Sequence, residues 1–213
     1  MSLKFRVNEA DLRAVYSRLD GIKNPQSALK QAINAAAKPV RDDLSKKAAD
    51  VYVYGGGWSQ IRAAAVIRNA TASRPVAEIE FRSPVSEITK YKVSSKSVST
   101  TRMTAKGKRV RRTLKGAVLR AGGIKPLHGA TGSAFNVRFR SGHVSVVTRS
   151  PDEIANRFAG RKLTKHTQKL RVWQSPSIPK LIENEKVYGA EEARIREMIH
   201  EQVQNVIGRL VNG

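Results

Sequence analysis

Residues of the types that carry out catalysis or bind metals are few in this chain and lie far apart. The four histidines (His128, His143, His166 and His200) do not occur in pairs, whereas a zinc site of nitrogen and oxygen ligands needs such residues close together, for example one helical turn apart. The chain contains no cysteine, which excludes disulfides, thiolate metal sites and cysteine nucleophiles. The sequence therefore predicts no metal site and no cofactor.

Carboxylates and activated nucleophiles are also scarce in the central part of the chain. Its acidic residues are Glu87, Asp152 and Glu153, and the last two belong to a segment that is typical of a helix start. Neither Ser133 nor Ser150 lies in the sequence pattern of a nucleophile elbow. The glycine-rich segments lack the Gly-Lys-Ser/Thr pattern of a phosphate loop, and we expect flexible turns at residues 55–57, 122–123 and 129–132. We therefore expect no enzymatic activity and no small-molecule substrate.

Positive charge is concentrated between residues 82 and 171. This stretch holds 22 lysines and arginines and three acidic residues, and the whole chain has a net charge of +23. Such an excess of like charge repels itself and is rarely selected for stability. Three explanations stay open: a solvated face, a nucleic-acid partner or an acidic protein partner. Stacking aromatics are sparse and no helix-turn-helix, zinc-finger or RNA-recognition pattern occurs, so a nucleic acid would be contacted through its backbone.

Residues 94–113 (SSKSVSTTRMTAKGKRVRRT) contain almost no side chain that a core could bury. We expect an exposed loop or a long hairpin arm that becomes ordered on a partner. The cations that we predict to contact a polyanion or a protein partner lie at the end of this arm and in a second basic segment: Lys106, Lys108, Arg109, Arg111, Arg112, Arg161 and Lys162.

The N-terminal quarter of the chain has the patterns of a strand and two helices. Residues 3–7 alternate apolar and polar side chains, which predicts a short strand, and residues 8–19 have helical spacing. Asn24-Pro25 begins a second helix that reaches nearly to Val51 along an alanine-rich stripe. Pro39 interrupts this stripe, so we expect a kink near Ala36. We expect no signal peptide, because charges are spread through the first residues.

The C-terminal part mirrors this arrangement. Ser175-Pro176-Ser177-Ile178-Pro179 predicts an extended segment that cannot become helical before Pro179. A short turn follows, and residues 189–211 form an amphipathic helix with Glu191 and Glu192 in its first turn. No apolar run approaches the roughly 20 residues of a membrane helix, so we expect no membrane partner.

The middle of the chain is predicted to be rich in strands. Alternation or β-branched residues favour strands at 76–81, 91–93, 116–120, 134–139, 143–149 and 170–173. Arg140-Ser141-Gly142 predicts a hairpin turn between two of them, and Phe135 and Phe139 share the parity of core positions. Ser150-Pro151-Asp152-Glu153 predicts a helix that reaches Phe158. We thus expect an α+β protein with terminal amphipathic helices packed on a central antiparallel sheet, forming one domain over residues 1–213 with an extended basic arm at 94–113.

Several short motifs occur in an order that resembles a known family. They are Gly132-Ser133-Ala134-Phe135, then Gly142-His143-Val144-Ser145-Val146-Val147-Thr148-Arg149, and then Ser175-Pro176-Ser177-Ile178-Pro179-Lys180. With the N-terminal strand, the alanine-rich helix and the closing helix, this order is similar to that of the minor tail protein Z family, the tail-completion proteins of long-tailed phages. The resemblance spans most of the chain, although residues 94–113 and 151–169 are longer than the family needs.

The resemblance implies a structural virion protein that completes the phage tail. Such a protein would form a homo-oligomeric ring, contact other tail proteins (tube, terminator or baseplate), and reside in the virion tail after assembly in the host cytoplasm. A nonspecific contact with the DNA path is also open. The alternative function is a sequence-nonspecific nucleic-acid-binding protein that contacts phosphates through its basic middle.

Overall fold

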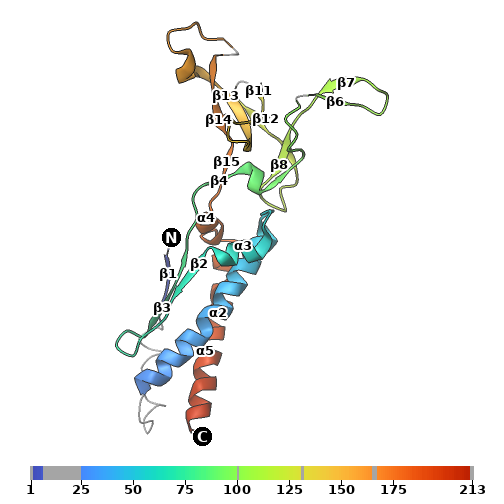
Figure 1. The fold of residues 1–213 in the computed structure, drawn as a ribbon. Coiled ribbons are helices and arrows are strands. Elements are labelled where there is room, and N and C mark those ends of the chain that lie inside the picture. Colours follow the sequence, from blue (N-terminus) through green and yellow to red (C-terminus); the bar gives the residue numbers. More distant parts are fainter. Residues whose placement is uncertain (1, 7–24, 100, 131, 165–166, 212–213) are drawn as a thin grey trace. The chain divides into compact units, whose positions relative to one another are not determined.

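The computed structural model describes residues 2–6, 25–99, 101–130, 132–164 and 167–211 (Figure 1). It belongs to the predicted α+β class, with helices and antiparallel strands. The chain divides into two compact units. Unit 1 comprises the described parts of residues 1–51, 57–84 and 177–213, and unit 2 comprises those of 52–56 and 85–176. Where we predicted one domain with one central sheet, the strands form several small sheets distributed over the two units.

Two long antiparallel helices build unit 1. Helix α2 (Pro25–Val51) begins at a proline, which is tolerated in the first turn, and continues through Pro39. Helix α5 (Tyr188–Val211) lies beside it in the opposite direction (Figure 1). Small residues of α2 allow close approach, and the core between the helices contains Ala28, Leu29, Ala32, Ile33, Val203 and Val206. Burying each of these valines contributes about 1.5–3 kcal/mol relative to exposure.

A three-stranded antiparallel sheet completes this core. Its order is β1 (Ser2–Arg6), β3 (Val76–Phe81) and β2 (Ala65–Arg68), with Leu3 opposite Ile79 and Ile67 opposite Ile79. The predicted strand at 76–81 is confirmed, and so is the predicted strand at 3–7 as far as Arg6, while Val7 lies outside the described residues. Helix α3 (Gly57–Ala63) is held by the fully buried Ile61, and α4 (Ile178–Ile182) buries Leu181 and Ile182. The sequence did not predict α3 or β2, and the helix predicted at 8–19 lies outside the described residues.

Unit 2 is built mainly of strands, most of them short. The predicted hairpin is present, because β12 (Phe135–Arg138) pairs with β13 (Val144–Ile154) through a turn in which Gly142 has φ +84°. Strand β14 (Gln168–Val172) pairs with the other edge of β13. The remaining strands pair as β4 (Ser86–Glu87) with β15 (Gln174–Ser175), β5 (Lys92–Val93) with β8 (Lys115–Ala117), β8 with β9 (Lys125–Pro126), β6 (Thr101–Met103) with β7 (Arg109–Arg111), and β10 (His128–Gly129) with β11 (Gly132–Ser133).

The helix predicted from Ser150 to Phe158 is wrong. Strand β13 continues to Ile154, and only a 3-10 turn, η2 (Asn156–Phe158), follows. The register between β13 and β14 shifts between Arg149 and Ile154. Pro151, which the sequence suggested as a helix start, lies in this irregular stretch of the strand, where a proline is tolerated. Glu153 is bound by cations of β14 instead of capping a helix. Phe139, predicted as a core position, is 38% exposed, because it lies at the hairpin turn after the end of β12.

Two tyrosines lie in the core of unit 2 beside the other 3-10 turn, η1 (Ile88–Lys90). The rings of Tyr54 and Tyr91 meet edge to face at 5.3 Å, and the hydroxyl of Tyr91 donates a hydrogen bond of 2.6 Å to the carbonyl oxygen of Pro176. Burial raises the pKa of Tyr91 above its ordinary value, so the phenol keeps its proton and stays a donor.

Candidate polyanion or partner interface

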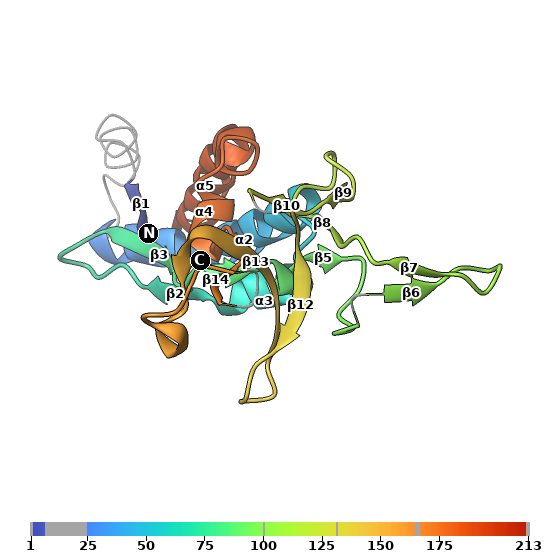
Figure 2. The same cartoon turned by 90° about the horizontal axis from the view of Figure 1, so that it is seen from above.

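Residues 101–111 of the basic segment 94–113 form a hairpin arm in unit 2 (Figure 2). Strands β6 and β7 pair antiparallel, with Thr101 opposite Arg111 and Met103 opposite Arg109. The turn is closed by a hydrogen bond of 2.9 Å from the backbone N of Thr104 to the carbonyl oxygen of Lys108, and Gly107 supplies the positive φ of +70°. Of the two predicted forms, exposed loop and hairpin arm, the structure has the hairpin.

The cations at the tip of the arm are exposed. Lys106 and Lys108 lie in the turn, and Arg109 begins β7. The side chain of Met103, which pairs with Arg109 across the hairpin, is 61% exposed. The tip therefore presents positive charge next to an apolar side chain, with no acidic residue anywhere in residues 94–113.

The root of the arm is fixed by side-chain hydrogen bonds. The buried Asn136 of β12 donates from Nδ2 to the carbonyl oxygens of Ser95 (2.9 Å) and Ser97 (2.8 Å). Arg112 donates from Nη1 to the hydroxyl of Ser95. On the other side of the root, the backbone N of Lys115 donates to the hydroxyl of Ser94 at 3.0 Å. These bonds tie the arm to the β12 strand and to the β5–β8 pair.

The structure does not place all predicted contact residues together. Lys106, Lys108, Arg109 and Arg111 belong to the hairpin, with Arg111 opposite Thr101, whereas the half-buried Arg112 serves its root. Arg161 and Lys162 are exposed in the segment that follows η2, which lies on a different side of unit 2 from the hairpin in both views (Figures 1 and 2). Arg157 and Arg161 cover the ring of Phe158 at 4.6 and 5.7 Å.

Unit 2 as a whole is strongly cationic. It contains 21 of the 40 lysines and arginines and only three of the 17 acidic residues, so 19 cations and 14 acids remain for unit 1. Two of the three acids of unit 2, Glu153 and Glu87, have side-chain partners within the unit. Glu153 is bound by Lys169 at 2.7 Å and by Arg171, and hydrogen bonds from these two cations hold the pKa of its carboxyl below the ordinary value.

Glu87 is the second acid with side-chain partners. Its carboxylate accepts a hydrogen bond of 2.6 Å from the hydroxyl of Ser145 and contacts His143 Nε2 at 3.1 Å. Partial burial opposes its ionisation, but the hydrogen bonds from Ser145 and His143 outweigh this effect and lower the pKa of Glu87. Because Ser145 donates to Glu87 and not to His143, these residues do not form a Ser–His nucleophile–base pair.

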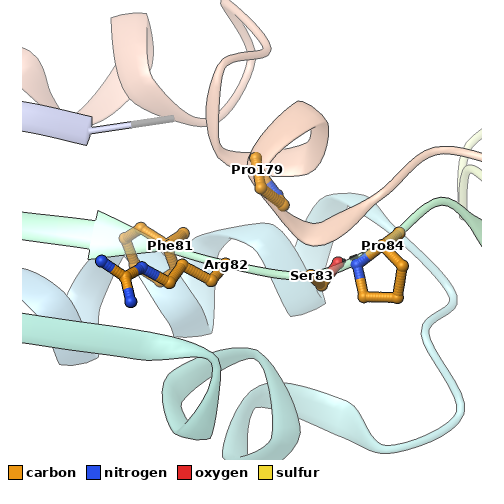
Figure 3. Close-up of a pocket in the computed structure, with 5 residues that line it drawn as sticks. All are labelled: Phe81, Arg82, Ser83, Pro84 and Pro179. Carbon is orange, nitrogen blue, oxygen red and sulfur yellow. Dashed lines mark hydrogen bonds between the residues drawn. The ribbon is translucent and has the colours of Figure 1, made fainter.

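One hollow of about 480 Å³ lies in unit 1, lined by Phe81, Arg82, Ser83, Pro84 and Pro179 (Figure 3). The Ser83 hydroxyl accepts a hydrogen bond from the backbone N of Ile178 and donates one to the carbonyl oxygen of Pro84, each 3.0 Å long. Arg82 is paired with Glu80 at 2.5 Å. The lining thus offers neither a carboxylate nor a histidine for acid–base catalysis.

In the part of the chain that the structure describes, no three His, Asp or Glu side chains gather closely enough to bind a metal ion. Within the same residues, no helix has both the length and the apolar character needed to cross a membrane.

Comparisons with protein-family models, with curated proteins and with solved structures found no match to this chain. Sequence reasoning found the cations of the arm, because their density is visible in the sequence. It missed Asn136, which looks like an ordinary polar residue on an alternating strand and whose role depends on carbonyl groups 41 and 39 residues away.

Proposed function

We propose that this protein is a structural component of a phage tail that assembles by docking its basic arm on acidic surfaces of neighbouring subunits. The tail assignment rests on the order of the sequence motifs that resemble the minor tail protein Z family. The docking mode rests on one observation: a hairpin arm whose exposed tip carries Lys106, Lys108 and Arg109 and no acid.

The arm suits a protein partner for two reasons. Its tip combines cations with the exposed Met103, and contacts with a protein surface use both charge and apolar area. Its root is tied by Asn136, so this part of the arm is already fixed before binding, which lowers the entropy lost on docking. A tail-completion protein of this kind would form a ring through contacts that join unlike surfaces of successive copies.

The test is the position of the protein in whole virions and its behaviour with tail tubes. Purified tubes should bind the wild-type protein, and K106E/K108E should bind more weakly at the same salt concentration. The matched control is K30E/K38E, which reverses two exposed lysines of α2. Density for the protein at an end of the tail supports the proposal, and its absence from the virion overturns it.

A second candidate is a sequence-nonspecific nucleic-acid-binding protein. One observation favours it: a two-stranded β-ribbon is one of the shapes that the major groove of DNA admits, and β6–β7 is such a ribbon with a basic turn. Binding to unrelated duplex DNA would then fall steeply with salt, because each phosphate contact releases condensed counterions. Strong salt-dependent duplex binding by a protein that stays monomeric and ignores tail tubes would favour this second function.

A further inference from the structure

Unit 1 carries a second candidate interface. Its central side chain is exposed and is not needed for the packing of the unit. Trp58, in helix α3, is 40% exposed, although α3 packs on α2 and already buries Ile61 fully. An indole left in solvent on an anchored helix is a frequent centre of protein–protein contacts, where tryptophan and arginine are enriched.

Two cations from different helices converge on this indole. Lys46 of α2 lies 5.9 Å and Arg62 of α3 lies 5.8 Å from the ring centroid. Arg62 is held in place by Asp42, which contacts its Nε at 2.9 Å and also binds Arg41 at 2.7 Å. The Lys46 and Arg62 side chains remain 57% and 44% exposed. We call Trp58, Lys46 and Arg62 the Trp58 patch.

The chemistry of the Trp58 patch fits an acidic protein surface better than a nucleic acid. Both cations already lie over the ring, so a stacking base would have to displace one of them, whereas carboxylates can bind both cations in place. Unit 1 is also nearly balanced in charge, with 19 cations and 14 acids, and so lacks the excess that draws a polyphosphate.

A complementary surface lies on helix α5 of the same unit. Ala193, Glu197 and Glu201 are exposed and follow one another at intervals of one turn, so they share one face. Glu197 and Glu201 form no ion pair with any residue that the structure describes, whereas Glu192 is paired with Arg196. Like charges one turn apart repel, and two opposing cations from outside would relieve this repulsion.

The two surfaces lie at different levels of the α2–α5 pair. Lys47 binds Glu191 and Asp43 binds Arg194 near the beginning of α5, while Val203 and Val206 pack on Ala28 and Leu29 at the opposite end of α2. Lys46 therefore lies at the level where α5 begins, and Glu197 and Glu201 lie further along α5 toward its end. We propose that the Trp58 patch of one copy docks on the Ala193–Glu197–Glu201 face of a second copy. Because the contact joins unlike surfaces, it can repeat from copy to copy and close into a ring.

Charge reversal in the full-length protein tests this interface, with sedimentation velocity as the measure of self-association. K46E/R62E and E197K/E201K should each weaken self-association at least about tenfold, the usual effect at an interaction hot spot. W58A should do the same without any change of charge. The combined variant K46E/R62E/E197K/E201K should associate again, because the charges face each other with reversed signs. K30E/K38E serves as the control for net charge.

Three results would overturn the proposal: a wild-type protein that stays monomeric at high concentration, association that is insensitive to W58A, or no recovery in the combined variant. A mixture of K46E/R62E with E197K/E201K adds a further check. In the mixture, opposite charges meet at both kinds of contact between the two variants, so association beyond that of either variant alone should recover, and no recovery would count against the proposal. Thermal unfolding of each variant confirms that it is folded. The arm variant K106E/K108E separates this proposal from the proposed function, because it leaves the Trp58 patch intact and should keep self-association through it.

Discussion

The amide group of Asn136 donates a hydrogen bond of 2.9 Å to the carbonyl oxygen of Ser95, 41 residues earlier in the chain. The same nitrogen reaches the carbonyl oxygen of Ser97 at 2.8 Å. One buried side chain of the β12–β13 hairpin therefore satisfies two backbone acceptors at the root of the basic arm. A hairpin of two short strands is only marginally stable by itself in water, so its attachment matters.

Replacing this side chain should loosen the arm. Asn136→Ala leaves two carbonyl groups without their donor and should lower the unfolding free energy of unit 2 by about 1–3 kcal/mol. Hydrogen exchange in residues 94–99 should increase strongly, while exchange in α2 and α5 stays unchanged. Asn156→Ala, at an exposed position of the same unit, is the control. Unchanged exchange at residues 94–99 in Asn136→Ala would show that the arm is held by other contacts.

The cations of the arm should separate into two groups by their effects. Lys106→Ala and Lys108→Ala should elute from a heparin column at lower salt, because both lysines are exposed and free to meet a polyanion. Arg112→Ala should lower the thermal midpoint more than either, because the half-buried Arg112 binds the Ser95 hydroxyl. Lys30→Ala and Lys38→Ala in α2 control for net charge. Equal shifts in elution for all five variants would mean that only total charge counts.

The elements that the sequence predicted well are those whose pattern is local. Strand β3 alternates apolar and polar residues within itself, and α5 shows its apolar stripe within one segment. The segment after Ser150 was mispredicted because its conformation is decided elsewhere. Glu153 looks like a capping residue, but Lys169 and Arg171 of β14 bind it and keep the chain extended. Local signals cannot reveal a strand partner that lies 18 residues further along the chain.

The same limit applies to the candidate sites. The density of lysines and arginines in the arm is visible in the sequence, and with it the identity of the tip residues. The root of the arm and the Trp58 patch depend on side chains that meet only in the folded chain, such as Lys46 with Trp58 from two different helices. Their residue types carry no pattern of spacing that could have predicted these contacts.

Glu87 of β4, whose carboxylate accepts a hydrogen bond from Ser145 of β13, should make the stability of the protein depend on pH. The folded pKa of Glu87 lies below its unfolded value, so its ionised form stabilises the protein above the unfolded pKa, and this contribution is lost as the pH falls through the folded pKa. Glu87→Gln should therefore lower the unfolding free energy by about 1 kcal/mol at pH 7 and make no difference once the wild-type carboxyl is protonated. Urea titrations at a series of pH values measure this difference. Glu185→Gln, at an exposed position, should show none, and a constant difference at all pH values for Glu87→Gln would rule out ionisation as the cause.

Helices α2 and α5 approach each other closely, so larger side chains should not fit at the small residues of α2 that face α5. Ala32 is 1% exposed in the core with Val203 and Val206, so Ala32→Leu should overpack the helix pair and cost about 1–3 kcal/mol. Ala35, one turn away on the same helix, is exposed, and Ala35→Leu should be nearly neutral. Equilibrium urea unfolding of both variants provides the comparison. Similar stability of the two would contradict tight packing at Ala32.

The sequence suggested a flexible turn at residues 129–132. The structure instead indicates that Gly129 is required for the contact between β10 and β13. A Cβ at this position would lie 2.8 Å from Cγ2 and 2.9 Å from Cβ of Thr148, closer than side chains tolerate. Gly129→Ala should therefore push the two strands apart and destabilise unit 2 by about 1–3 kcal/mol. Gly122→Ala is the matched control, because its Cβ would meet its nearest atoms at an ordinary 3.7 Å. Thr148→Ser removes the Cγ2 methyl and should recover part of the loss in the double variant, and a double variant as unstable as Gly129→Ala alone would place the conflict elsewhere.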